Sequence, residues 1–214
     1  MNTFFDPVNN TAAVEQLNKE RGKDGGRTVL ISGCIDTQKV HISSAIASGY
    51  KYMLIVTSDE AKARKMCDDA SFFNKEAIYY PAKDAIFYSA DVHGNQITGE
   101  RLRCISRIIN HSSTGEGVLT VVTTMDGIAD RLIPVERFKE AVITLDYSSE
   151  IEPEKLAKKL VAMGFVRTGM VEDKGQFAIR GGIIDIFSYT DEAPVRIELW
   201  DTEVDSLRMF DVER

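Results

Sequence analysis

The spacing of apolar residues changes near Pro134, and this change constrains the fold more than any other feature of the sequence. Before it, short apolar runs alternate with segments in which apolar residues recur every three or four positions, the pattern of strands followed by helices. Such alternation is typical of a parallel sheet covered by helices. After it, apolar and polar residues alternate, which indicates an antiparallel sheet with one buried face. We therefore predict two domains, residues 1–134 and residues 135–214.

The first half is predicted to be an α/β domain with a parallel sheet. Its expected strands are Thr28–Ile31, Tyr52–Val56, Ile78–Tyr80 and Val118–Val122. Helices are expected to begin at Asp36, after Ser58 and after Thr98, where the two hydroxyl residues serve as N-caps. The last strand is apolar throughout, as central strands of parallel sheets are.

The second half is predicted to be a smaller α+β domain with an antiparallel sheet. A strand is expected at Ala141–Leu145, followed by a helix over Glu154–Met163 that Pro153 introduces and Gly164 ends. Gly181-Gly182 provides a two-residue hairpin turn between the first two of four further strands. These four strands are expected at Gln176–Arg180, Ile183–Phe187, Val195–Trp200 and Val204–Phe210.

The turn between the first strand and the first helix matches a phosphate-binding loop only in part. The P-loop pattern is Gly, any four residues, then Gly-Lys-Ser/Thr, and Gly33 and Lys39 stand in register with it. Gln38 replaces the second glycine, whose missing side chain lets backbone amides approach the phosphates. Val40 replaces the hydroxyl residue that ligates magnesium. We predict a degenerate, inactive loop that hydrolyses no ATP.

Charge and cysteine content argue against several classes of function. The net charge is −7, and the residues from Glu136 to Arg214 include 11 basic and 17 acidic ones, so neither half forms a basic surface for nucleic acid. The three cysteines, Cys34, Cys67 and Cys104, form no CxxC pair and lack zinc-site spacing to the histidines. We predict reduced thiols and no catalytic residue, metal or cofactor.

Targeting signals are also lacking in the sequence. No apolar run approaches the roughly 20 residues that a membrane span needs. The first residues contain neither the basic region nor the apolar region of a signal peptide. A cytoplasmic location is therefore expected.

The segment from Gly175 to Phe210 carries an ordered series of short motifs. They are Gly175, Phe177, Arg180-Gly181, Asp185-Ile186-Phe187, Arg196, Leu199-Trp200, Asp201 with Glu203, and the run Asp205–Asp211. This series resembles the second domain of the bacterial transcription-repair coupling factors (Mfd) and, more distantly, the equivalent domain of the excision-repair protein UvrB. In the first half, Tyr80-Pro81-Ala82 and Arg101-Leu102 resemble the first domain of the same family more loosely.

The resemblance implies a non-catalytic module that recruits the excision-repair protein UvrA to RNA polymerase stalled at DNA damage. It also implies a longer protein that continues beyond Arg214, whose other regions bind RNA polymerase and form an ATP-driven translocase on double-stranded DNA. Arg180, Arg196 and Trp200 match the family's UvrA-contacting positions, and Trp200 replaces the usual phenylalanine. The degenerate loop fits domains that resemble those of UvrB but have lost nucleotide binding.

Strand alternation gives a separate reason to expect a partner surface in the second half. The apolar residues of Val195–Trp200 fall on one face, and Arg196, Glu198 and Trp200 fall on the other. Arginine and tryptophan are enriched among residues that dominate binding energy. The same alternation also allows Arg196 and Glu198 to pair across the sheet while Trp200 fills the junction between the domains.

Two other functions are compatible with parts of the sequence. A UvrB-like, ATP-using DNA-repair helicase fragment would carry an intact Gly-Lys-Thr after the first strand, which this chain lacks. A Rossmann-type small-molecule binder would need a GxGxxG turn and an acidic residue after the second strand. Asp59 meets only the second requirement.

Overall fold

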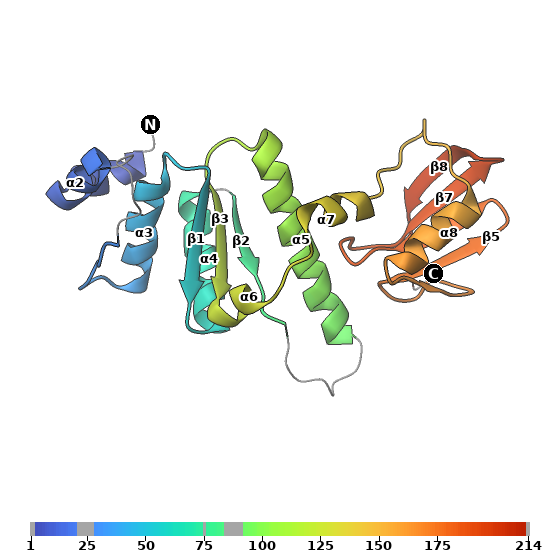
Figure 1. The fold of residues 1–214 in the computed structure, drawn as a ribbon, viewed down its shortest axis with the longest axis horizontal. Helices are drawn as coiled ribbons and strands as arrows, with labels where there is room; N and C mark the ends of the chain where they lie inside the picture. The colour runs from blue at the N-terminus through green and yellow to red at the C-terminus, as the bar shows by residue number, and fades with distance from the viewer. Residues whose placement is uncertain (1–2, 21–27, 75, 84–91, 213–214) are drawn as a thin grey trace. The chain divides into compact units, whose positions relative to one another are not determined.

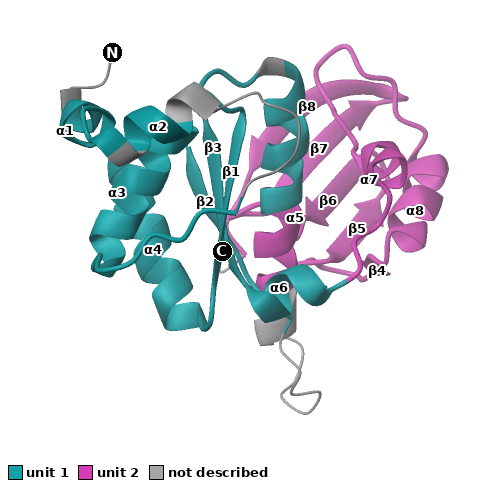
Figure 2. Cartoon of the chain, turned by 60° about the vertical axis from the view of Figure 1, so that its left-hand side comes forward, with its two compact units in different colours: residues 1–83, 104–130 teal, residues 84–103, 131–214 magenta. Residues whose placement is uncertain are grey.

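The chain forms two compact units in a computed structural model that describes residues 3–20, 28–74, 76–83 and 92–212. The first unit contains residues 1–83 and 104–130, and the second contains residues 84–103 and 131–214 (Figure 2). A domain boundary after residue 134 stays a prediction. Within the described residues, no helix has both the length and the apolar character needed to cross a membrane.

The first unit is built on three parallel strands, in the order β1-β3-β2 (Figure 1). The predicted α/β class is thereby confirmed, and β3, which is largely buried, lies at the centre. The helix α5 (Val92–Thr114) is divided between the units. The other elements are η1 (Thr3–Phe5), α1 (Asp6–Asn9), α2 (Ala12–Glu20), α3 (Asp36–Ala47), β1 (Tyr52–Thr57), α4 (Glu60–Phe73), β2 (Ala77–Tyr80), β3 (Leu119–Thr124) and α6 (Met125–Ala129).

Helices cover both faces of this sheet. On one face, Val40 of α3 and Met66 of α4 pack in one buried cluster with Val122 of β3. On the other, Cys104 of α5 packs with Leu119 of β3 and neighbouring apolar residues. The layers therefore follow the helix–sheet–helix order typical of parallel sheets.

Three local predictions for the first half of the chain are wrong. Thr28–Ile31 is not a strand, because β1 pairs with β3 alone among the described strands, and Leu30 is 90% exposed. Asp59 rather than Ser58 caps α4, since its carboxylate accepts a hydrogen bond from the Lys62 amide. The helix α5 begins at Val92, so Thr98 lies inside it instead of capping it.

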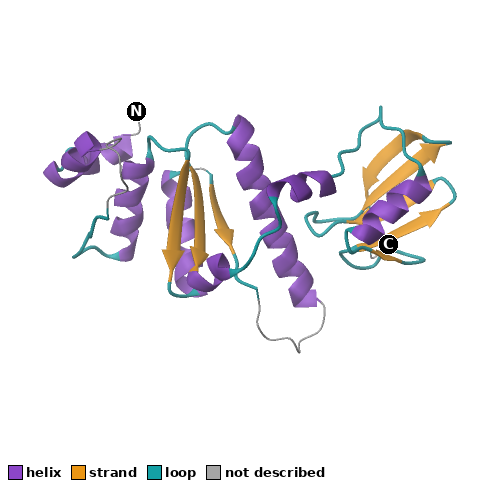
Figure 3. Ribbon diagram, in the orientation of Figure 1, coloured by secondary structure: helices purple, strands orange, loops and turns teal. Residues whose placement is uncertain are grey.

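The second unit is built on a five-stranded sheet in the order β4-β5-β6-β7-β8 (Figure 2), and Figure 3 shows strands in orange. The strands β5 to β8 pair antiparallel, which confirms the predicted α+β class. The short strand β4, which was not predicted, pairs parallel to β5. The elements are α7 (Val135–Ala141), α8 (Pro153–Ala162), β4 (Val166–Arg167), β5 (Gln176–Arg180), β6 (Ile183–Phe187), β7 (Val195–Trp200) and β8 (Glu203–Met209).

The strand predicted at Ala141–Leu145 is also wrong. Ala141 ends α7, and residues 142–146 have no strand assignment. Ile143 and Leu145 still pack against the core of the second unit. Their alternating burial therefore resembles that of a strand although the segment joins no sheet.

The helix α8 covers one face of this sheet (Figure 1). Its buried Leu156 and Leu160 lie in one cluster with Phe177, Ile184 and Ile197, one residue from each of the three central strands. Because side chains alternate along a strand, residues 180, 185 and 196 lie on the opposite face. That face is where the candidate site lies.

Replacing Ile197 by alanine is expected to destabilise the second unit by roughly 2–5 kcal/mol, because the change leaves a cavity in a closed core. Hydrogen exchange of the β6 amides measures this local stability. Val161→Ala, at an exposed position of α8, is the control and should cost less than about 0.5 kcal/mol. Equally small effects of both changes would contradict this packing.

Candidate functional site

The face of the second unit's sheet that lies opposite α8 carries a group of charged side chains, here called the arginine face. β5, β6 and β8 each contribute one member, and β7 contributes two. They are Arg180, Asp185, Arg196, Glu198 and Arg208.

Asp185 is the centre of the arginine face. Its side chain is only 2% exposed, and it lies directly opposite Arg196 in the register of β6 and β7. Arg196 donates from Nε to Oδ1 at 2.7 Å and from Nη2 to Oδ2 at 2.9 Å. Arg180 donates from Nη2 to Oδ2 at 2.6 Å. One buried carboxylate therefore holds both predicted arginines side by side.

Arg196 is held on a second side by an aromatic ring. Its guanidinium carbon lies 4.6 Å from the centre of the Phe210 ring, a cation–π arrangement. The hydrogen bonding of Arg196 to the Asp185 carboxylate is the main cause that raises the pKa of Arg196 above its ordinary value. Arg196 therefore stays charged, and its side chain retains 27% exposure toward solvent.

Glu198 keeps a third arginine away from this pair. Arg208 lies opposite Arg196 in the register of β7 and β8, where two like charges destabilise each other. Arg208 instead forms an ion pair with Glu198, its diagonal neighbour. The alternative in which Arg196 pairs with Glu198 is therefore wrong. With three arginines and two carboxylates, the arginine face has a net charge of +1 within an acidic half of the chain.

Trp200 ends β7, two residues beyond Glu198, and is 79% exposed. The side chain of Arg180, at the end of β5, is 47% exposed. The three residues predicted to bind a partner thus all retain exposed surface in the second unit.

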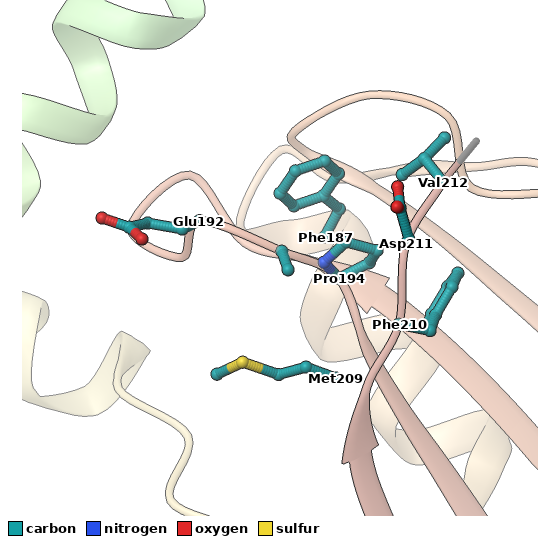
Figure 4. Close-up of a pocket in the computed structure, with 8 residues that line it drawn as sticks. Phe187, Glu192, Pro194, Met209, Phe210, Asp211 and Val212 are labelled. Carbon is teal, nitrogen blue, oxygen red and sulfur yellow. The ribbon is translucent and has the colours of Figure 1, made fainter. Parts of the chain in front are cut away.

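A hollow of about 440 Å³ adjoins the arginine face at Phe210. Figure 4 shows Phe187, Pro194 and Phe210 around it, while the carboxylate of Glu192 extends away from the rings. Its walls are mainly apolar, with Glu192 and Asp211 as the acidic members. The hollow can hold an apolar group but has no set of side chains for acid–base chemistry.

The residues of the predicted phosphate loop are engaged within the first unit. The Gln38 side chain accepts a hydrogen bond from the Ile35 amide at 3.1 Å, an amide that the start of a helix would otherwise offer to an anion. Lys39 Nζ lies 2.9 Å from Asp36 Oδ1, and this bond is the main cause that lowers the pKa of Asp36. Val40 is fully buried, and Gly33 adopts a positive φ of 77°. Gln38 and Lys39 are therefore engaged at the start of α3 itself, and Val40 belongs to the core.

The described ranges contain no set of three or more His, Cys, Asp or Glu side chains placed to hold a metal ion. Burial is the main cause that raises the pKa of the Cys67 thiol to about 11, so Cys67 is not a nucleophile at neutral pH.

Two comparisons place this chain among known proteins. Residues 143–214 match the family model of the UvrB interaction domain. The chain is 36% identical over 190 residues to the transcription-repair-coupling factor of Bacillus subtilis (strain 168), and 34% identical over 192 residues to that of Staphylococcus aureus (strain USA300). These matches cover 87% and 88% of the chain but only 16% of each relative.

Both findings confirm the resemblance that the motifs of Gly175–Phe210 indicated. The residues that match the family model include the whole arginine face and Trp200. Residues 143–214 thus match the UvrB interaction domain family, and the chain is similar over most of its length to one part of a transcription-repair-coupling factor.

Proposed function

We propose that this chain is a non-catalytic module that binds UvrA through the arginine face and Trp200. The observation that carries the proposal is the buried Asp185, which presents two charged arginines together on a sheet face that α8 leaves open. This face lies within the residues that match the UvrB interaction domain. Arg180, Arg196 and the exposed Trp200 are of the residue types most enriched in binding hot spots.

The partner surface should be acidic beside an apolar pocket. Guanidinium groups recognise carboxylates in a bidentate geometry, and an exposed indole gains most by entering an apolar pocket. Because the surrounding half of the chain is acidic, the arginine face is a local positive site that helps to orient the encounter.

A second proposal concerns a longer protein of which this chain would be one part. It rests on the two coupling-factor relatives, of whose length the matches cover only 16%. We propose that regions outside this chain bind RNA polymerase and act as an ATP-driven translocase on double-stranded DNA. In that arrangement, this chain would bring UvrA to polymerase stalled at damage. An ATP-using helicase fragment like UvrB is the alternative, and the engaged Lys39 and buried Val40 argue against it.

Trp200→Ala is expected to weaken UvrA binding by about 30-fold or more, as truncation of a hot-spot tryptophan does. The melting temperature should barely change, because the side chain is exposed. Calorimetric titration with purified UvrA measures the affinity. Val161→Ala, an exposed apolar residue of α8, should bind normally, and equal affinity of both variants with wild type would contradict the site.

Arg180→Ala is expected to weaken UvrA binding by about tenfold or more while leaving the fold intact. Arg196 would still donate two hydrogen bonds to Asp185 in this variant, so the buried carboxylate would remain neutralised. Lys155→Ala, which removes an exposed cation from α8, is the matched control. A loss of affinity common to both variants would show that net charge alone is responsible.

Magnesium-ATP is expected to leave the melting temperature of the chain unchanged at millimolar concentration. A ligand present at 100 times its dissociation constant would stabilise the fold by about 2.7 kcal/mol. Differential scanning fluorimetry of wild type and Lys39→Ala provides the comparison. If magnesium-ATP raised the melting temperature of wild type and Lys39→Ala abolished that rise, the loop would bind nucleotide. This result would overturn the proposal of an inactive loop and favour the helicase alternative.

A further inference from the structure

We infer that Asp185 is a positioning residue for partner binding, one that acts by fixing the geometry of Arg180 and Arg196 before the partner arrives. The inference rests on the proposed function. Asp185 is itself buried and cannot touch a partner while both arginines cover it. Its effect must therefore pass through their guanidinium groups.

The contacts of Arg196 restrict its side chain on more than one side. Two parallel hydrogen bonds to Asp185 define the plane of its guanidinium, and the Phe210 ring lies 4.6 Å from its central carbon. A long side chain that is free in solution loses rotamer freedom when a partner orders it. Since Asp185 has already ordered Arg196, the partner meets a prepared surface.

The same carboxylate leaves both arginines able to donate outward. Each guanidinium carries five N–H donors, and Asp185 accepts one hydrogen bond from Arg180 and two from Arg196. Most donors therefore lie outside this contact. They suit carboxylates on an acidic protein surface, approached from the exposed side of the sheet.

Positioning and simple charge attraction make opposite predictions for Asp185→Asn. The change removes one negative charge and raises the net charge of the arginine face from +1 to +2. If the arginines acted only as charges, an acidic partner would bind this variant more tightly and associate faster. If Asp185 acts by positioning, the variant binds more weakly and dissociates faster despite its added positive charge.

The experiment measures association and dissociation rates of the chain on immobilised UvrA at two salt concentrations. For Asp185→Asn we expect at least tenfold weaker binding, carried mainly by a faster dissociation rate. Asp205→Asn removes an exposed carboxylate from β8 and should bind as wild type or slightly more tightly. In the Arg180→Ala background, Asp185→Asn should cost less than it does alone, because part of its effect passes through Arg180.

Arg196→Lys is a second variant that tests the same inference if Asp185→Asn does not fold. The lysine keeps the charge but cannot donate two parallel hydrogen bonds to Asp185. Positioning therefore predicts weaker UvrA binding, whereas attraction by charge alone predicts unchanged binding. Wild-type binding by Arg196→Lys, tighter binding by Asp185→Asn, or equal costs of Asp185→Asn in both backgrounds would overturn the inference. If Trp200→Ala still weakens binding in that case, the proposed function stands and only the role of Asp185 fails. If wild type does not bind UvrA, the proposed function itself fails.

Discussion

The carboxylate of Asp185, buried in the middle strand of the second unit's sheet, governs the surface around it. A buried charge is costly unless it is paired and hydrogen-bonded, so both neighbouring strands supply an arginine. Arg208 lies opposite Arg196 and would repel its guanidinium, but Arg208 pairs with Glu198 instead. The single helix α8 shields only the opposite face, where Ile184 and Ile197 are fully buried. The same sheet thus buries an apolar core on one face and a paired carboxylate on the other.

The turn before α3 and the start of α3 retain Gly33 and Lys39 of the P-loop pattern, but no strand precedes them among the described residues. A strand, a turn and a helix normally create an anion site, because the first helical amides point outward. Here Gln38 binds one of those amides and Asp36 neutralises Lys39. Val40 contributes to the core at the position where a hydroxyl would bind magnesium. These side chains therefore hold one another at the start of α3.

Periodicity predicted the elements that pack most regularly, namely the four strands β5 to β8 and the helices α3 and α8. It was wrong for Thr28–Ile31 and Ala141–Leu145, since apolar composition does not reveal whether a strand finds a neighbour to pair with. The site residues were identified by resemblance to a family, and Asp185 was only a motif residue. A carboxylate inside the apolar run Ile183–Phe187 was the signal for its role, but its partners depend on strand register, which local sequence does not specify.

The central claim is that UvrA covers the open face of the second unit's sheet, and Trp200 offers a direct probe because it is the only tryptophan in the chain. Incorporating 5-fluorotryptophan would give the chain a single fluorine resonance. The exposure of 79% predicts a clear difference in its chemical shift between H2O and D2O. Addition of unlabelled UvrA should abolish that difference as the ring becomes buried. A resonance that keeps its full solvent dependence in a UvrA complex would contradict the account.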